Sequence, residues 1–147
     1  MSAPHYRHTQ FGTVIVLALI LAAGFTVGME VLTGVVPLAV IGVALMGVFL
    51  ALFFSLTVEI GATHLTFRFG IGLIRQRIPL AEIVTVKPVH NTWLYGWGIH
   101  RTPHGWLYNV SGWEAVEITL VTGKRFRLGT DEPQRLARML QAVTERR

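Results

Sequence analysis

Apolar residues divide the chain into a uniformly hydrophobic early segment and a remainder in which apolar and polar positions alternate. Phe11 to Met29 is a run of nineteen uncharged residues that ends at Glu30. As an α-helix this run would be about 28 Å long, close to the ~30 Å hydrocarbon core of a bilayer. A second uncharged run, from Val31 to Val58, follows directly. The pattern predicts two membrane-spanning helices.

The second run is longer than one span requires, and Gly34 and Pro37 supply a turn at its start. Pro37 suits the first turn of a helix because the N–H that proline lacks would have no helical partner there. We therefore expect the second helix near 36–54, antiparallel to the first because the connection is short. A cleaved signal peptide or two buried helices of a soluble protein are alternatives. The signal peptide is disfavoured because a second full-length span follows directly. Buried helices of a soluble protein are disfavoured because both runs are apolar on every side.

Basic residues flank the predicted hairpin on one side of the membrane only. Arg7 precedes the first helix, and Arg68, Arg75 and Arg77 follow the second, whereas the loop between the helices has no Lys or Arg. Because short cytoplasmic segments carry an excess of Lys and Arg, both termini are expected to face the cytoplasm. The predicted location is the cytoplasmic (inner) membrane, with a multi-pass topology.

After the hairpin, short alternating runs separated by turn residues are typical of strands. We expect strands near 57–60, 65–69, 73–78, 84–89, 113–120 and 125–128. The stretch 90–112 is the least regular part, with three of the four Trp residues and several turn residues. Thr130 or Asp131 caps a final helix, in which apolar residues recur at helical spacing from Leu136 to Val143.

These elements predict three parts. Residues 1–10 form a cytoplasmic N-terminal tail, 11–56 a hairpin of two transmembrane helices, and 57–147 a cytoplasmic domain. The fold class is a membrane α-helical hairpin plus a mainly-β, partly open barrel of six or seven short strands, closed by a C-terminal helix.

Composition narrows the chemistry. Only 14% of residues are charged, against roughly 25% in soluble domains. The chain has no cysteine, which excludes disulfides, thiolate metal sites and cysteine nucleophiles. After Ile60, twelve Lys and Arg residues stand against six acidic ones, so the predicted domain is basic.

Three segments of the predicted domain carry a resemblance to a known family. They are Thr57-Val58-Glu59-Ile60, the stretch from Gly96-Trp97-Gly98-Ile99 to Gly105-Trp106-Leu107-Tyr108-Asn109, and Leu128-Gly129-Thr130-Asp131-Glu132-Pro133. Together they resemble the bacterial PH-like (pleckstrin-homology-like) domains of small membrane proteins with two helices. The resemblance covers about 56–147 and implies a PH-like barrel with a capping helix. It implies no catalytic residues.

An aromatic-rich segment is the first candidate site. Six Trp and Tyr residues fall within twenty-one positions: Trp93, Tyr95, Trp97, Trp106, Tyr108 and Trp113. Trp and Tyr favour membrane–water interfaces because their rings are amphipathic, although ordinary core packing is the alternative for most of them. Trp93 and Trp97 lie in a turn-rich stretch, and we expect these two to contact lipid or a partner.

Basic residues interleave with that segment and extend beyond it: Lys87, Arg101, Lys124, Arg125 and Arg127. A positive domain at the cytoplasmic leaflet is attracted to anionic lipid by ~1 kcal/mol per well-placed Lys or Arg. These five residues are therefore candidates for lipid or partner binding. A solvated face with the ordinary positive-inside bias is the alternative.

Metal binding and catalysis find little support. His100 and His104 flank Thr102-Pro103, and the proline prevents the regular helix that would bring such a pair together. No nucleophile elbow or phosphate-binding glycine loop occurs. We expect no metal, no cofactor, no catalytic residues and no small-molecule substrate. The membrane accounts for the basic charge, so nucleic-acid binding is not expected.

The sequence thus predicts a non-enzymatic integral membrane protein that presents a cytoplasmic PH-like domain for protein or anionic-lipid binding. It fits an accessory subunit of a larger membrane complex. Two alternatives stay open. One is a homo-oligomeric membrane scaffold. The other is a component of an enzyme or transporter with a site at the membrane face, near Glu30, Glu59 or the His100–His104 segment.

Overall fold

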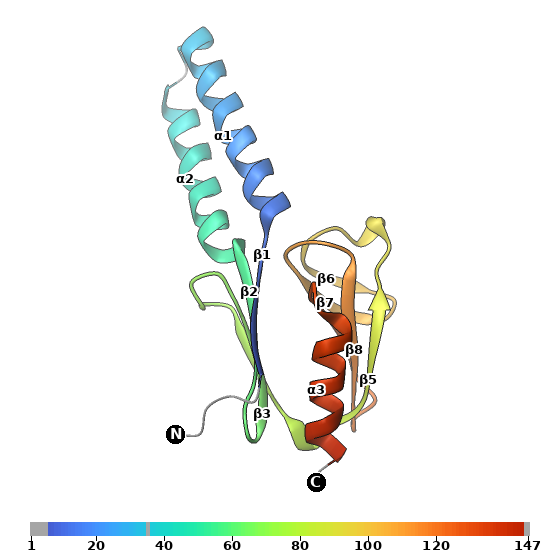
Figure 1. Ribbon diagram of the computed structural model, residues 1–147. Coiled ribbons are helices and arrows are strands. Elements are labelled where there is room, and N and C mark those ends of the chain that lie inside the picture. Colours follow the sequence, from blue (N-terminus) through green and yellow to red (C-terminus); the bar gives the residue numbers. More distant parts are fainter. Residues whose placement is uncertain (1–5, 35, 146–147) are drawn as a thin grey trace.

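A computed structural model describes residues 6–34 and 36–145, in which a helix hairpin rises from one end of a two-sheet β domain (Figure 1). The helices are α1 (Thr13–Thr33), α2 (Val36–Phe53) and α3 (Pro133–Glu145), with 3₁₀ turns η1 (Leu80–Glu82) and η2 (Trp93–Tyr95). The strands are β1 (Tyr6–Phe11), β2 (Ser55–Ile60), β3 (His64–Phe69), β4 (Arg75–Pro79), β5 (Ile83–His90), β6 (Gly98–Thr102), β7 (Gly105–Asn109), β8 (Glu114–Leu120) and β9 (Arg125–Gly129).

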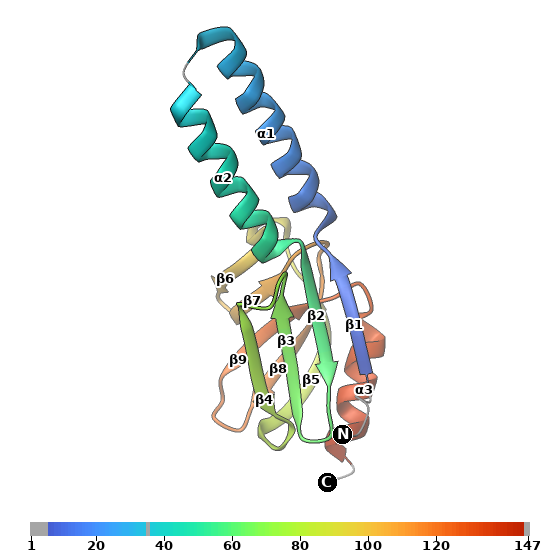
Figure 2. The same cartoon turned by 90° about the vertical axis from the view of Figure 1, so that its left-hand side faces the viewer.

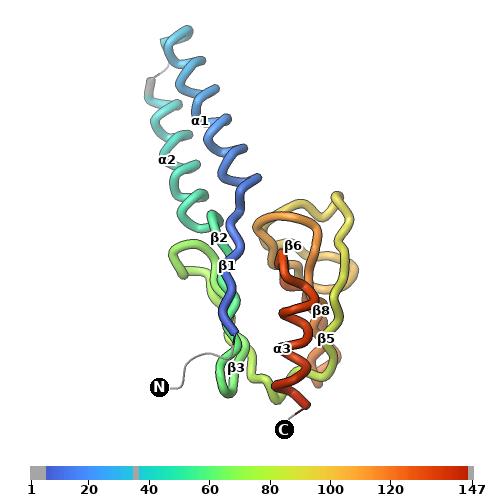
Figure 3. Tube along the Cα trace, viewed as in Figure 1, coloured from blue at the N-terminus to red at the C-terminus, as the bar shows by residue number. Residues whose placement is uncertain are grey.

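The two apolar helices interrupt a β-hairpin. Strands β1 and β2 are antiparallel, with Tyr6 opposite Ile60 and Phe11 opposite Ser55. The Cα trace in Figure 3 shows that β1 continues directly into α1 and that α2 continues directly into β2. Both predicted apolar helices are therefore present, and their bases are held together by the strand pair from which they emerge.

The two helices differ in length. By length and composition, α1 is the one helix of the described chain that is long and apolar enough to cross a membrane, and none of its apolar window is buried. In α2, the apolar stretch Pro37–Phe53 is shorter. The two helices contact each other: Ala39 is buried, and a Cβ atom at Gly42 would lie 3.9 Å from the Thr26 Cγ2 atom.

The β domain consists of two sheets that face each other across one core. The first is an antiparallel meander in the order β1-β2-β3-β4, and the second has the order β5-β8-β9-β7-β6, in which β7 runs parallel to β9. Alternation along the strands directs apolar side chains inward. Phe67 of β3 therefore packs against Tyr108 of β7, with ring centroids 4.8 Å apart, and against Phe126 of β9 at 6.0 Å.

Helix α3 covers the side of this core along β5 and β8 (Figures 1 and 2). Its apolar stripe buries Leu136 and Leu140 completely, and Gln141 donates a hydrogen bond of 2.9 Å to the Val86 carbonyl. The predicted C-terminal helix is confirmed, as is a mainly-β domain at this coarser level.

Two parts of the sheets were not anticipated. Residues 6–10 were assigned to a tail and Phe11 to the first helix, but together they form β1, whose strand pattern is too short to be recognised without its partner β2. The stretch that the sequence pattern left least regular includes the β6–β7 hairpin, where Gly98 and Gly105 adopt positive φ angles of 110° and 101°. The described chain thus has nine strands in two sheets instead of six or seven in one barrel.

Candidate functional site

The end of the β domain that carries the helices is built around a tight junction. The Gly12 N–H donates to the Phe54 carbonyl at 2.8 Å, which joins the bases of α1 and α2. A Cβ atom at Gly12 would lie 2.9 Å from the Phe53 carbonyl oxygen and 3.2 Å from that of Val110. A side chain would therefore force the helix base away from the sheet, so glycine at this position permits the close contact.

The β3–β4 turn is bound to the same junction. Gly70 N–H donates to the Ser55 carbonyl at 2.8 Å, and Ile71 N–H donates to the Ala51 carbonyl at 3.1 Å. Figure 2 shows this turn beside the base of α2. Residues 70–73 are therefore fixed at the level where α2 ends.

The aromatic segment 91–97 lies at this end as well. Asn91 N–H donates to the Trp113 carbonyl at 2.7 Å, and the Trp97 indole donates to the Gly112 carbonyl at 3.2 Å. The loop 110–113 in turn accepts a 3.1 Å hydrogen bond from the Gln10 amide to the Ser111 carbonyl. These contacts link the aromatic segment to β1 just below α1, and Figure 1 shows the yellow segment near 90–97 reaching the height of the helix base.

Five exposed apolar side chains at this end form what we call the apolar rim. Their exposed fractions are 63% for Phe11, 62% for Ile71, 75% for Leu73, 73% for Trp93 and 72% for Leu94. Apolar groups gathered on one end of a domain are typical of an interaction surface. Sequence reasoning identified only Trp93. Ile71 and Leu73 could have been noticed because they are apolar residues in a glycine turn, where polar residues are usual.

A groove of about 370 Å³ opens beside the rim, lined by His90, Asn91, Thr92, Trp93, Leu94 and Trp113. Trp93 stands out into solvent, whereas Trp97 packs on Trp113 with ring centroids 4.9 Å apart. The two predicted aromatic contacts therefore differ: Trp93 is available to a lipid or partner, and Trp97 mainly supports the groove from within.

Of the five predicted basic residues, Lys87 and Arg127 are the cross-strand neighbours of Glu117, on β5 and β9 respectively. Lys87 on β5 and Arg101 on β6 are exposed on the two edge strands of the second sheet. Lys124 and Arg125 are exposed at the β8–β9 turn, which lies at the end of the domain away from the helices (Figure 2). No single basic surface includes these four.

Arg127 has a different environment. Its Nε donates to Glu117 Oε2 and its Nη1 to Asn91 Oδ1, both at 2.9 Å, and the Arg127 and Glu117 side chains are 9% and 12% exposed. The Asn91 Nδ2 atom is buried with no hydrogen-bond partner in the described structure. Arg127 therefore attaches the start of the aromatic segment to the sheet, and its guanidinium is not presented to lipid.

Two tyrosines have perturbed acidity. Burial raises the pKa of the Tyr108 hydroxyl. Burial, followed by the negative charge of Glu132, also raises the pKa of the Tyr6 hydroxyl, which donates to Glu132 at 3.4 Å. His8 lies 2.5 Å from the Asp131 carboxylate. Tyr6 and His8 thus connect β1 to the start of α3, so these groups support the fold.

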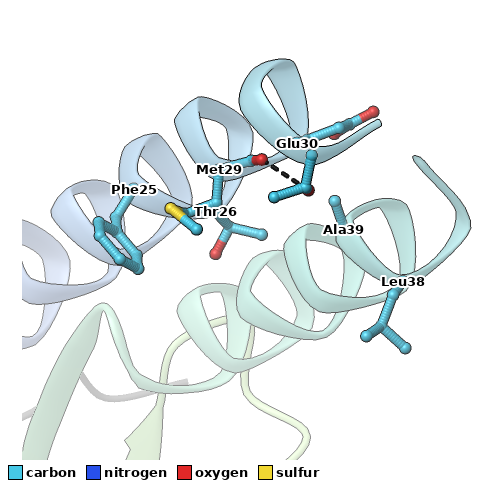
Figure 4. A pocket seen from close by; sticks show the side chains of 7 residues that line it. Phe25, Thr26, Met29, Glu30, Leu38 and Ala39 are labelled. Atoms are coloured by element: carbon cyan, nitrogen blue, oxygen red, sulfur yellow. Dashed lines mark hydrogen bonds between the residues drawn. The ribbon is translucent and has the colours of Figure 1, made fainter. Parts of the chain in front are cut away.

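A second pocket, of about 280 Å³, lies between α1 and α2 near their tip. Figure 4 shows Phe25, Thr26 and Met29 on α1 and Ala39 on α2, with the Glu30 carboxylate pointing away from the other lining residues. Within the described residues, Glu30 has no ion-pair partner. Glu30 is the one ionisable residue that lines this pocket, so the lining does not contain the pair of ionisable groups that acid–base catalysis would use.

The other residues considered for catalysis or metal binding have structural partners. Glu59 pairs with Arg7 at 3.2 Å. The His100 ring is hydrogen-bonded to the Trp97 carbonyl, and the His104 ring lies 6.5 Å from that of Tyr95. Over residues 6–34 and 36–145, no three His, Asp or Glu side chains are grouped so as to hold a metal ion.

Comparison with known proteins adds no relative to this picture: no family model matches the chain, and no curated protein matches it.

Proposed function

We propose that this chain is a non-enzymatic integral membrane protein. In this proposal α1 and α2 cross the bilayer as a hairpin and hold the β domain at the cytoplasmic surface, where it binds a protein partner or anionic lipid. The β domain is PH-like in this view. Its two mostly antiparallel sheets and its C-terminal helix support that assignment, and β1 is an additional strand.

One observation carries the proposal: β1 and β2 pair along their whole length on either side of the helix hairpin. Strands that share a ladder lie on the same side of a membrane, because backbone groups in an open sheet cannot be satisfied within lipid. If α1 crosses the bilayer, α2 must return across it. The ladder therefore argues against a single span, although α2 is the shorter helix.

The basic flanks support a cytoplasmic orientation for the domain. The junction at Gly12 leaves no linker between sheet and helix, so the domain would touch the membrane surface. In that position the apolar rim faces the headgroup layer, and the groove beside Trp93 is open to a partner from the side.

Topology can be tested because the natural chain has no cysteine. Thr33→Cys places a thiol at the hairpin tip, and Thr122→Cys places one in the β8–β9 turn, both at exposed positions. In intact bacterial spheroplasts, a membrane-impermeant maleimide should label the tip variant, and it should label the turn variant only after lysis. Labelling of both from one side would overturn the two-span proposal.

Binding can be tested by purifying the tagged full-length protein from its membrane in a mild detergent and identifying bound proteins by mass spectrometry. A stoichiometric partner that is lost in Trp93→Ala/Leu94→Ala but kept in Val84→Ala/Val121→Ala would support the groove as its site. The control pair is also exposed and apolar but lies near the turn distant from the helices. A partner that both variants retain equally would contradict the groove assignment.

A further inference from the structure

The outer face of the first sheet carries an unusual pair of like charges. Arg68 of β3 and Arg75 of β4 are directly opposite each other in the ladder, so their side chains share one face. Like charges placed directly opposite in a sheet are destabilising. An anion bound between the two guanidinium groups would reduce this repulsion.

The chain itself supplies little counter-charge to this face. In the described residues, the carboxylate in ion-pair contact with it is that of Glu59, 3.2 Å from Arg7 Nε and 3.9 Å from Arg68 Nη2. Arg75 is exposed and has no carboxylate partner within the described part of the chain. Glu59 is therefore shared, and the net charge of the face stays positive.

The position of the pair relative to the helices suggests what the partner is. The β3–β4 turn is bonded to the end of α2 through Ile71 and Gly70, so the turn lies at the level where the helix ends. Arg68 is two residues before Gly70, which places it roughly 7 Å further along the strand. The headgroup layer is about 5–7 Å thick on each side of the hydrocarbon core, so the arginines lie at its depth.

The turn between the two arginines is apolar and exposed. Ile71 and Leu73 project at its tip, 62% and 75% exposed. Figure 2 shows this turn beside the base of α2 and away from α3. The apolar tip of the turn is followed along the strands by the two arginines. A lipid leaflet has the same order, with the acyl chains first and the phosphates next.

We propose that Arg68 and Arg75 bind the phosphate of an anionic phospholipid in the leaflet beside α2, while Ile71 and Leu73 insert between neighbouring lipids. This site rests on the proposed function, because it requires α2 to end at the membrane surface. The site includes none of the five basic residues that the sequence indicated as binding candidates, although Arg68 and Arg75 were among those used to predict the orientation. A bound phosphate would offset the repulsion between the arginines by charge-assisted hydrogen bonds.

The test is native mass spectrometry of the detergent-solubilised full-length protein, titrated separately with phosphatidylglycerol and phosphatidylcholine. Arg68→Gln/Arg75→Gln should lower the phosphatidylglycerol affinity by roughly 30-fold, if each cation contributes as expected near a membrane surface. The matched control is Lys124→Gln/Arg125→Gln, which removes the same charge at the far end of the domain and should change the affinity less than about 3-fold. Ile71→Ser/Leu73→Ser should weaken binding of both lipids.

Three results would overturn the site: equal losses in the two charge variants, no loss in either, or displacement of the lipid by inorganic phosphate at a similar concentration. Thermal unfolding of each variant checks that it is folded. Arg68→Lys/Arg75→Lys, which keeps the charge, should retain most of the affinity and separates a charge effect from misfolding. The cysteine labelling above distinguishes the two failures: if both spans form but the charge variants behave alike, the lipid site fails and the membrane hairpin stands.

Discussion

Replacing Arg127 by methionine tests whether the aromatic segment is held by a buried ion pair. The change removes two hydrogen bonds of 2.9 Å and leaves the Glu117 carboxylate, 12% exposed, without its cation. It also leaves the Asn91 side-chain oxygen, in a residue only 1% exposed, without its donor. Breaking a buried pair from one side costs about 3–5 kcal/mol, because the remaining charge stays buried.

The related variants should follow an order. Glu117→Gln also leaves a buried charge without its partner, but it should cost less than Arg127→Met because Arg127 keeps its bond to Asn91 and the glutamine oxygen still accepts. Arg127→Met/Glu117→Leu should be more stable than Arg127→Met alone, since no unpaired charge remains. Arg7→Gln is the surface control: Arg7 is 59% exposed and Glu59 31%, so loss of their pair should cost below about 1 kcal/mol.

Urea unfolding of the full-length protein in detergent micelles, followed by tryptophan fluorescence, measures these differences, because Trp97 and Trp113 pack together close to Asn91. The reasoning fails if Arg127→Met is as stable as Arg7→Gln, or if the double variant is less stable than Arg127→Met. Either result would mean that water solvates the pair. Arg127 would then return as a candidate for lipid or partner binding.

Two further predictions concern the junction and the pH range. Gly70 has a φ of +44°, and a Cβ atom there would overlap the Ala51 carbonyl oxygen. Gly70→Ala should therefore destabilise the protein by more than the about 1–2 kcal/mol that a left-handed backbone conformation costs alone. Gly123 has a φ of +79° but open space around it, so Gly123→Ala should cost only that about 1–2 kcal/mol in the same urea assay. The raised pKa of the Tyr6 hydroxyl means that the folded state retains a proton that the unfolded state loses, so its contribution is intact below about pH 10 and falls as pH rises further. Tyr6→Phe should therefore reduce the loss of unfolding free energy on the alkaline side, and an unchanged pH profile would contradict this role.

The sequence predicted those elements whose pattern is local. The apolar run from Phe11 has a composition that only lipid or a large core accommodates, and α1 occupies it. The stripe from Leu136 to Val143 fixes the buried face of α3 without knowledge of its partner, and Leu136 and Leu140 are fully buried. The strands that were anticipated alternate strongly, as in Leu65-Thr66-Phe67-Arg68-Phe69.

The elements that were missed depend on partners distant in the sequence. β1 contains Arg7, His8 and Gln10, and it becomes a strand because β2, forty-four residues after it, supplies its ladder. The candidate site was only partly predictable for the same reason. Spacing drew attention to Arg127 and Lys124, but spacing does not show that the first is buried beside Glu117. The Arg68–Arg75 pair depends on strand register, which the β3–β4 turn sets.

The fold also predicts which fragment of this protein is soluble. A fragment that begins at Thr57 lacks β1 and exposes an edge of β2, a strand buried over most of its length, so it should aggregate. Gly12 and Phe54 are already joined by a backbone hydrogen bond, so a two-residue Asn-Gly turn in place of residues 13–53 would close the β1–β2 pair as an ordinary hairpin. That variant should be soluble without detergent, elute as a compact species and retain the amide dispersion of a folded β domain. If the fragment from Thr57 folds equally well, β1 is dispensable for the folding of the β domain, and the reasoning from the exposed β2 edge fails.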